Sequence, residues 1–489
     1  MKDSGCAIVS EERIDCILAN GHKGRAVTVK QVDVVIIGGG LAGIFAAYEL
    51  TLKAPQASVL LIEQGDSIEK RSCPIIAGKV PRCINCPVCD IMRGFGGAGA
   101  FSDGKFNFTT KFGGWLTDYL PEKEVMSLID YVDEVNQSFG ATADVYSTET
   151  PAADVIRLKA LGEDIHLLDA RCKHVGTEKN RVLLKKFSDF LAERIELWTN
   201  VKVDTFEPAD GGYRLVTTKG EISCDYLIAA PGRAGAEWFA EECRRLDLKL
   251  LNNQVDIGVR VELPALVFKE ITDAMYEAKL MYRTKQYGDQ VRTFCMNPYG
   301  YVVSENTDGI ITVNGHSYDA ADLRSQNTNF ALLVSNRFTE PFNEPYRYGK
   351  HIASLSNMLG GGVIVQRLGD LLDGRRTDHH RLQKSYVRPT LDATPGDISL
   401  VLPKRHLDNI VEMLFALDRL APGTANRDTL LYGVEVKFYS SRLELTSTFE
   451  TKLPNLFAIG DGAGITRGLS QAGASGVQAA RTVASRLLA

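Results

Sequence analysis

The sequence lacks the features that would place the protein in a membrane or on a nucleic acid. No apolar run in its 489 residues approaches the roughly 20 residues needed to span a bilayer. Positive charge is not in excess either. The formal net charge is −5, whereas a general nucleic-acid binder needs a basic surface to displace counterions. We therefore expect a small-molecule partner, and neither a membrane nor a nucleic acid.

A secretory leader, internal repeats and low-complexity segments are also missing from the sequence. Lys2 is followed by acidic residues rather than by an apolar segment, so the start of the chain does not resemble a signal peptide. We therefore expect a cytoplasmic protein whose ten cysteines are thiols or ligands rather than disulfides. A chain of this length is expected to form two or more domains.

A dinucleotide-binding pattern is the first feature that the sequence does contain. The apolar, β-branched run Val32–Ile37 predicts a buried parallel strand. It leads into Gly38, Gly40 and Gly43, a G-x-G-x-x-G pattern ahead of a helical segment. These glycines permit a tight turn, the approach of a pyrophosphate, and close packing of helix and strand. A second apolar strand ends in Glu63, whose carboxylate is placed to bind ribose hydroxyls.

FAD rather than NAD is indicated by segments in the middle and near the end of the chain. Leu453–Gly464 is typical of flavoproteins with two dinucleotide folds, in which its aspartate, here Asp461, binds the ribityl chain. The small residues from Gly473 predict a helix start facing the flavin ring, where negative charge builds up on reduction. Asp225–Gly232 predicts a strand and turn that return the chain to this domain, and Val203 a strand that contacts adenine.

Four segments carry a resemblance to a known family: Gly94–Lys105, Val255–Glu262, Thr394–Ile398 and Gly460–Gly464. On them the chain resembles the family of uncharacterised FAD-dependent dehydrogenases of bacteria and archaea, relatives of the two-dinucleotide fold of glutathione reductase. The resemblance extends over most of the chain and implies FAD, but it supplies no substrate. The chain departs from the family at Asn297–Gly300, which reads Asn-Pro-Tyr-Gly where the family has Cys-Pro-Gly-Gly.

These patterns together give a set of predicted FAD-binding residues. The glycines of Gly94–Lys105 let the backbone pass close to the flavin ring, and Ser102 and Asp103 bind polar atoms of the phosphates or the ring. Arg71 either meets the pyrophosphate or forms a surface salt bridge. The complete set is Gly38, Gly40, Leu41, Ala42, Gly43, Glu63, Gln64, Arg71, Gly97, Ala98, Ser102, Asp103, Val203, Ala230, Gly232, Gly460, Asp461, Gly473 and Ala474.

A cysteine cluster is the sharpest local irregularity of the sequence. Cys83, Cys86 and Cys89 follow the C-x2-C-x2-C spacing, and Cys73 precedes them by ten residues. Four such thiolates suit an iron–sulfur (4Fe–4S) cluster or tetrahedral zinc. Redox-active thiols beside the flavin are the next interpretation, and small buried hydrophobic side chains are the third. An iron–sulfur centre here would admit electrons.

The β-rich stretch from about Leu250 to Gly423 predicts the substrate domain. A second G-x-G-x-x-G, at Gly94, follows the cysteine loop rather than a strand, so we expect no dedicated NAD(P)H domain. Arginines suggest an acidic, carboxylate-bearing substrate. His316 and Tyr386 are acid–base candidates, and Arg467 lies between two flavin elements. The polar candidates are Arg260, Arg292, Cys295, Asn314, His316, Tyr386, Arg388 and Arg467, of which His316, Tyr386, Arg467 and Cys295 are the predicted catalytic residues.

The predicted fold is α/β, with a three-layer Rossmann-like FAD domain on a parallel sheet and a second, β-rich substrate domain. The predicted function is hydride exchange between a small organic substrate and flavin N5, with an electron-carrier protein as a further partner. Two alternatives stay open: a reductase fed through an iron–sulfur cluster, and a non-catalytic flavin redox sensor. The predicted divisions are 1–30 (extension), 31–111, 183–248 and 428–489 (FAD domain), 112–182 (helical insertion) and 249–427 (substrate domain).

Overall fold

A computed structural model describes residues 29–489 except 81, 82, 85, 308, 319, 337, 339–341 and 343. The predicted extension, residues 1–30, lies outside the described residues apart from its last two. No helix in the described part of the chain combines the length and the apolar character that crossing a bilayer requires.

The predicted α/β fold is confirmed, and its first sheet contains the predicted parallel strands. β1 (Lys30–Ile37) lies between β2 (Val59–Ile62) and β10 (Gly220–Ala229), and both neighbours are parallel to it. The four residues Val34–Ile37 are buried, as expected of a strand covered on both faces. The sheet is completed by parallel β7 (Glu196–Trp198) and β22 (Leu456–Ala458), and by antiparallel β8 (Val203–Ala209) and β9 (Gly212–Thr217).

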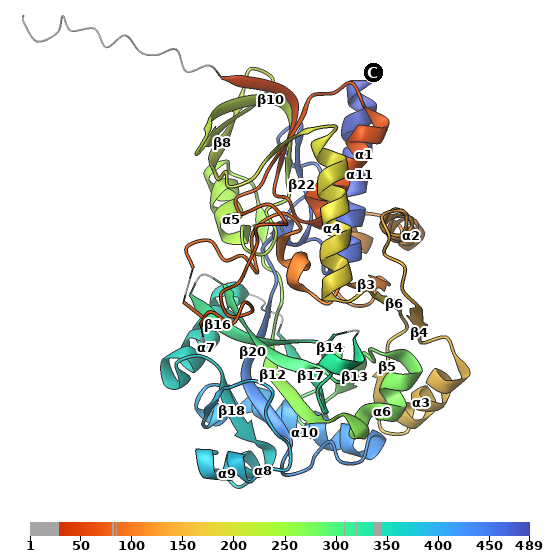
Figure 1. The fold of residues 1–489 in the computed structure, drawn as a ribbon, viewed down its shortest axis with the longest axis vertical. Helices are drawn as coiled ribbons and strands as arrows, with labels where there is room; N and C mark the ends of the chain where they lie inside the picture. The colour runs from red at the N-terminus through yellow and green to blue at the C-terminus, as the bar shows by residue number, and fades with distance from the viewer. Residues whose placement is uncertain are drawn as a thin grey trace, which may run out of the picture.

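Helices lie on one side of this sheet, and the β8–β9 hairpin extends the sheet beyond β10 (Figure 1). The helices are α1 (Leu41–Lys53), α4 (Thr177–Ala192) and α11 (Leu469–Leu487), with α2 (Glu122–Ser138) outside them. Small residues let α1 and α11 pack closely. A Cβ on Gly476 would meet the carbonyl oxygen of Ala42 at 2.1 Å. The predicted parallel sheet covered by helices is therefore present, and α5 (Ala236–Arg245) follows β10.

The second region is built on an eight-stranded sheet in the order β19-β18-β20-β12-β17-β14-β13-β5. β12 (Val255–Pro264) is buried along almost its whole length between β17 and β20. The other strands are β5 (Ile165–Leu167), β13 (Leu280–Arg283), β14 (Gln290–Asn297), β17 (Asn327–Asn336), β18 (Ile364–Arg367), β19 (Thr394–Pro395) and β20 (Leu430–Phe438). The helices of this region are α3 (Pro151–Leu161), α6 (Ala265–Met275), α7 (Pro345–Gly360), α8 (Leu368–Leu372), α9 (His379–Gln383) and α10 (Lys404–Leu420).

The strand pairings place two predicted divisions differently. We predicted that the chain returns to the FAD domain at 428, but β20 pairs with β12 and β18 in the second sheet. Without β20, the buried strand β12 would be left with an unpaired edge. The insertion predicted as helical, 112–182, also holds strands. One of them is β5 of the second sheet. The other two, β4 (Val145–Ser147) and β6 (Arg171–His174), form a small sheet with β3 (Lys105–Phe108), in the order β3-β6-β4.

A two-stranded ribbon lies where the two regions meet (Figure 1). It consists of β15 (Tyr301–Thr307) and β16 (Ile310–His316), which are antiparallel. The Asn306 side chain, near its tip, donates a hydrogen bond to the Cys83 sulfur at 3.1 Å. A second small pair, β11 (Leu250–Leu251) with β21 (Arg442–Leu443), joins the points where the chain passes between the regions.

Candidate flavin and substrate site

A cavity of about 820 Å³ has walls from both regions. Most of the predicted FAD-binding residues line it, although they come from six separate segments of the chain. These residues are Gly38, Gly40, Leu41, Ala42, Glu63, Gln64, Gly97, Ala98, Ser102, Asp103, Val203, Ala230, Gly232, Gly460 and Asp461.

Glycines shape the narrow part of this cavity. Gly38 has φ +104°, and a Cβ there would lie 2.1 Å from the carbonyl oxygen of Ala230, so only glycine fits. Gly40 and Gly97 face each other, since a Cβ on Gly97 would lie 3.1 Å from the Gly40 Cα. Both line the cavity, and neither presents a side chain to a ligand that passes between the two segments.

The first turn of α1 and Glu63 supply the polar groups at this end. The N-cap Gly40 has no capping side chain, so the first turn of α1 keeps amides that can bind a phosphate. Glu63 accepts hydrogen bonds from the backbone amides of Gly39, Gly65 and Gly94, each at 2.8 Å. A carboxylate has about four acceptor positions, so one remains for a ribose hydroxyl.

Arg71 does not occupy the place predicted for it. Its guanidinium is 1% exposed, does not line the cavity and donates to backbone carbonyls, including those of Asp90 (2.9 Å), Phe95 (2.7 Å) and Gly97 (2.8 Å). Burial lowers the pKa of Arg71 to about 10. The side chain therefore braces the loop that ends in Gly97, and the structure does not place it for contact with a pyrophosphate.

The C-terminal helix begins earlier than predicted, which moves two predicted residues away from the cavity. α11 starts at Leu469, and Gly468, Leu469 and Ala472 line the cavity. Gly473 and Ala474 instead pack in the interior, where a Cβ on Gly473 would meet Phe45 and Val132 at 3.1 Å. Gly43 also lies outside the cavity wall. Its missing Cβ leaves room for the Gly38 carbonyl oxygen, the packing role that the motif predicts.

The other end of the cavity contains a buried lysine that the sequence analysis did not single out. Lys279 is 3% exposed, and its ammonium group lies 4.0 Å from the ring centroids of both Phe112 and Phe294. The ammonium group also donates to the Phe112 carbonyl at 3.4 Å. Burial lowers the pKa of Lys279 to about 7, so the amine exchanges a proton near neutral pH.

A second buried lysine in the wall has carboxylate partners. Lys105 lies 3.0 Å from Glu277 and 3.4 Å from Asp103, and it donates to the Met296 carbonyl at 3.1 Å. Burial opposes its charge, but Asp103 and Glu277 raise the pKa of Lys105 well above its usual range. Lys105 therefore stays protonated.

Arg467, Cys295 and His316 all line the cavity, as predicted. The Arg467 guanidinium lies 4.5 Å from the Tyr439 ring centroid. Burial opposes its charge, but Tyr439 and Asp461 raise its pKa. Burial lowers the pKa of His316 below its usual value, so its ring is neutral at neutral pH.

Cys295 occupies an irregular position in β14. Its φ is +43°, and the register of β14 against β17 shifts between Phe294 and Asn297. Arg260, fully buried and paired with Glu435 at 3.1 Å, donates to the Cys295 carbonyl at 2.5 Å. Such bulges commonly re-aim side chains beside active sites. Arg260 thus acts behind the wall of the cavity and holds the bulge that presents Cys295.

Two protein-family models match the chain on the two sides of this cavity. Residues 33–73 match the model described as FAD dependent oxidoreductase. Residues 254–438, from β12 through β20, match the model described as FAD-dependent protein, C-terminal domain-like. The chain is an FAD-dependent oxidoreductase. The residues that would hold FAD fit this cofactor, since the glycine turn, the uncapped helix end and Asp461 line one continuous cavity.

Comparison with curated proteins finds no match, and solved structures match at low identity. Glycine oxidase from Geobacillus kaustophilus is 12% identical, with 94% of each chain covered and a TM-score of 0.37. L-amino acid deaminase from Proteus myxofaciens is 14% identical, with 94% of this chain and 91% of that chain covered and a TM-score of 0.39. The quinol fumarate reductase subunit FrdA from E. coli is 13% identical, with 94% and 71% covered and a TM-score of 0.41. Values this low carry no argument about the enzyme's substrate.

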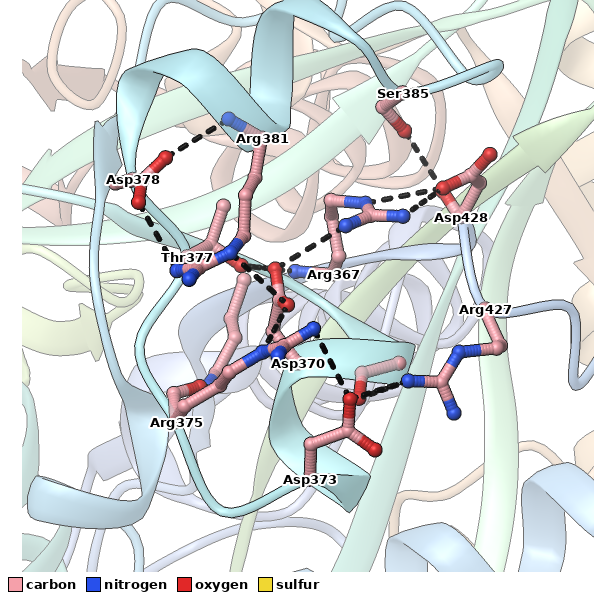
Figure 2. Close-up of polar contacts among 12 residues, drawn as sticks. Arg367, Asp370, Asp373, Arg375, Thr377, Asp378, Arg381, Ser385, Arg427 and Asp428 are labelled. Carbon is pink, nitrogen blue, oxygen red and sulfur yellow. Dashed lines mark hydrogen bonds and ion pairs between the residues drawn. The ribbon is translucent and has the colours of Figure 1, made fainter.

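Tyr386 does not belong to the active site, which corrects its predicted catalytic role. It is 79% exposed, and its backbone amide donates to Asp428 at 3.0 Å. Figure 2 shows the surrounding network of arginines and aspartates, in which Asp428 contacts Arg367 and Ser385. Arg388 is likewise exposed. Arg292 is buried outside the cavity wall and pairs with Asp256 at 3.0 Å.

The cysteine cluster is not arranged as a metal site. In the described part of the chain, no group of three or more His, Cys, Asp or Glu side chains is positioned to hold a metal ion. The prediction that Cys73, Cys83, Cys86 and Cys89 ligate iron–sulfur or zinc is therefore not supported. The four side chains instead line a second cavity, beside the flavin cavity.

Sequence reasoning missed Lys279, Glu277 and the role of Lys105 in the site. Lys279 stands just before the short apolar stretch Leu280–Tyr282, in a context without glycine, histidine or a repeated spacing. Only the approach of Phe112 and Phe294, from two distant segments, makes it a buried cavity residue. No local signal could have identified it. Lys105 closes the Gly94–Lys105 segment, and its proximity to that motif was the one available hint.

Proposed function

We propose that the enzyme oxidises a small organic substrate that carries a carboxylate, by taking a hydride from a substrate C–H bond. Bound FAD supplies the hydride acceptor, N5 of its ring. The observation that carries the proposal is that the cavity lined by the flavin motifs also holds two basic groups, the half-buried Arg467 and the buried Lys279. Arg467 is always charged, and Lys279 titrates near neutral pH.

Arg467 is the group best suited to hold the substrate carboxylate. A guanidinium binds a carboxylate through two parallel hydrogen bonds, which fixes orientation as well as position. The Tyr439 ring, whose centroid lies 4.5 Å from the Arg467 guanidinium, helps to keep this group in place. Substrates that share a carboxylate would then present the adjacent carbon in a constant place, which is what hydride transfer requires.

Lys279 is the group best suited to accept the substrate proton. Oxidation of an amine or alcohol releases a proton from nitrogen or oxygen as the C–H bond breaks. A base acts best when its pKa is near the working pH, and the Lys279 pKa of about 7 meets that condition. Phe112 and Phe294 enclose the amine and keep water away from it. His316, neutral in the same cavity, is the next proton acceptor along the wall.

The test is anaerobic mixing of the FAD-loaded enzyme with a panel of amino acids, amines, hydroxy acids and dicarboxylic acids. We expect at least one carboxylate-bearing compound to bleach the flavin absorbance, and its amide or ester to do so at least about tenfold more weakly. Bleaching by NAD(P)H together with none by any panel member would contradict the proposal. Equal bleaching by an acid and its amide would remove the assignment of Arg467.

A further inference from the structure

The cysteine loop encloses a cavity of its own, with a volume of about 250 Å³. Its wall contains all four cysteines of the cluster together with apolar side chains such as Val80 and Ile311. The four cysteines, Cys73, Cys83, Cys86 and Cys89, are partly exposed and form no disulfide with one another in the structure. Neither the flavin motifs nor the proposed substrate reaction uses them.

This cysteine cavity shares a wall with the flavin cavity. Five residues line both: Cys73, Ile75, Ile91, Arg93 and Ser304. Among the cysteines of the cluster, Cys73 alone belongs to both linings. Cys73 therefore lies between the cavity proposed to hold FAD and the cavity that contains Cys83, Cys86 and Cys89.

Hydrogen bonds join the sequence neighbours of Cys73 and Cys89. The backbone amide of Ser72 donates to the Asp90 carboxylate at 3.1 Å, and Arg71 donates to the Asp90 carbonyl at 2.9 Å. The residues next to Cys73 and Cys89 are therefore in direct contact. Burial raises the pKa of Cys89, and the nearby Cys73 and Cys83 thiols raise it further.

The remaining cysteines of the described residues, apart from Cys295, differ in exposure. Cys172, Cys224 and Cys243 are buried, and burial raises the pKa of each to about 12. These three thiols are inaccessible to other thiols, whereas Cys73 and Cys89 are partly exposed, as disulfide formation and exchange require.

We propose that Cys73 and Cys89 form a redox-active dithiol that receives the electron pair of the reduced flavin. In the oxidised state an S–S bond joins the two residues. Two electrons and two protons pass from the reduced flavin to this bond, which breaks into two thiols while the flavin is reoxidised. The dithiol then reduces a disulfide from solution, whose S–S bond breaks as the Cys73–Cys89 bond forms again. This electron transfer rests on the proposed flavin site, because it requires FAD in the first cavity.

The test counts electrons in the FAD-loaded protein and maps its thiols. After mild oxidation with a small disulfide and removal of the excess, the protein is titrated anaerobically with dithionite. Wild type should take up about two electrons beyond the two that the flavin accepts, because a disulfide is a two-electron couple. Cys73→Ser and Cys89→Ser should lose the extra two, and the matched loop variant Cys86→Ser should keep them.

Peptide mapping of alkylated wild-type protein identifies the pair without any variant. We expect a Cys73–Cys89 link after oxidation, and its loss after the flavin is reduced. An uptake of two electrons only, or a link between other cysteines, would overturn the assignment. Because dithionite replaces the substrate, a failure here is distinct from a failure of the proposed substrate reaction, which flavin bleaching tests separately.

Discussion

Charged groups are arranged in opposite ways at the far end of the second region and in the flavin cavity. Around Asp370, which is fully buried, Arg375 donates at 2.9 Å and Thr377 at 2.8 Å, with Arg367 at 3.4 Å (Figure 2). Lys279 is buried almost as deeply, yet its ammonium group contacts two aromatic rings and one carbonyl. The charge on Asp370 is matched by hydrogen-bond partners, whereas Lys279 has a pKa of about 7 and loses its charge near neutral pH.

The difference separates a buried charge that stabilises the fold, Asp370, from the one that we propose takes part in catalysis, Lys279. A matched group is already satisfied and has little to offer a ligand, although removing one partner costs stability. A buried base with a strongly lowered pKa is costly to keep charged, and it is expected where a proton must move. Position agrees with this division. Lys279 lines the flavin cavity, whereas the Asp370 network lies away from it around α8 and α9 (Figure 1).

The largest expected effect comes from removing the unmatched base. Lys279→Met should slow anaerobic flavin reduction by a substrate by about 10²–10⁴-fold, the usual contribution of general acid–base catalysis. Stopped-flow absorbance at saturating substrate measures this rate. The matched control is Lys173→Met, because Lys173 is also buried but is paired with Asp133 at 2.6 Å. An equal slowing in both variants would show that burial of any lysine, rather than this base, matters.

Breaking the matched network should affect stability instead of rate. Asp370→Asn should lower the free energy of unfolding by about 1–3 kcal/mol, because the buried side chain loses charge-assisted hydrogen bonds from Arg375 and Thr377. Urea unfolding measures the loss, and the rate of flavin reduction per bound flavin should stay unchanged. Asp373→Asn, at a more exposed partner of Arg375 and Arg427, should cost about 1 kcal/mol or less. The comparison fails if Asp370→Asn slows flavin reduction without destabilising the fold.

Arg467 offers a smaller effect, confined to acidic ligands. Arg467→Met should weaken binding of a carboxylate inhibitor by roughly 10- to 100-fold, equivalent to about 1.5–3 kcal/mol for hydrogen bonds to a charged group. Flavin perturbation spectra provide the dissociation constant. A neutral amide of the same inhibitor is the control and should bind both proteins alike. Equal losses for acid and amide would point to a collapsed cavity.

The smallest effect is expected at Tyr386. Tyr386→Phe should change the unfolding free energy by no more than about 0.5 kcal/mol and leave the rate of flavin reduction unaltered, because the side chain is on the surface. A marked loss of rate in this variant would restore the catalytic role that its sequence context suggested.

Roles that depend on the backbone could be predicted from the sequence. Gly38 and Gly40 act through space and φ, which the strand–glycine–helix order already specifies, and both line the cavity as expected. Roles that depend on contacts with residues far away in the sequence could not be predicted in this way. Arg71 has the distance from Glu63 in the sequence that is typical of a phosphate ligand. Its guanidinium instead donates hydrogen bonds to the backbone carbonyls of Asp90 and Phe95, which the sequence does not reveal.

The same limit applies to strand pairing and to Lys279. The sheet to which β20 belongs cannot be predicted from its own sequence. Its place in the second sheet depends on pairing with the edge of β12. Lys279 acquires its environment from Phe112, which is far away in sequence. Local pattern therefore identified most of the residues that line the glycine-rich end of the cavity, but not Lys279 at the other end.

The most direct test of the account is the pH dependence of anaerobic flavin reduction between about pH 5 and 9. Lys279 is protonated below its pKa of about 7 and cannot accept a proton there, so the wild-type rate should rise through that pH and level off above it. In Lys279→Met the remaining slow rate should lose this rise. A rise near pH 7 that persists in the variant would contradict the assignment and place the titrating base elsewhere, with His316 the next residue to replace.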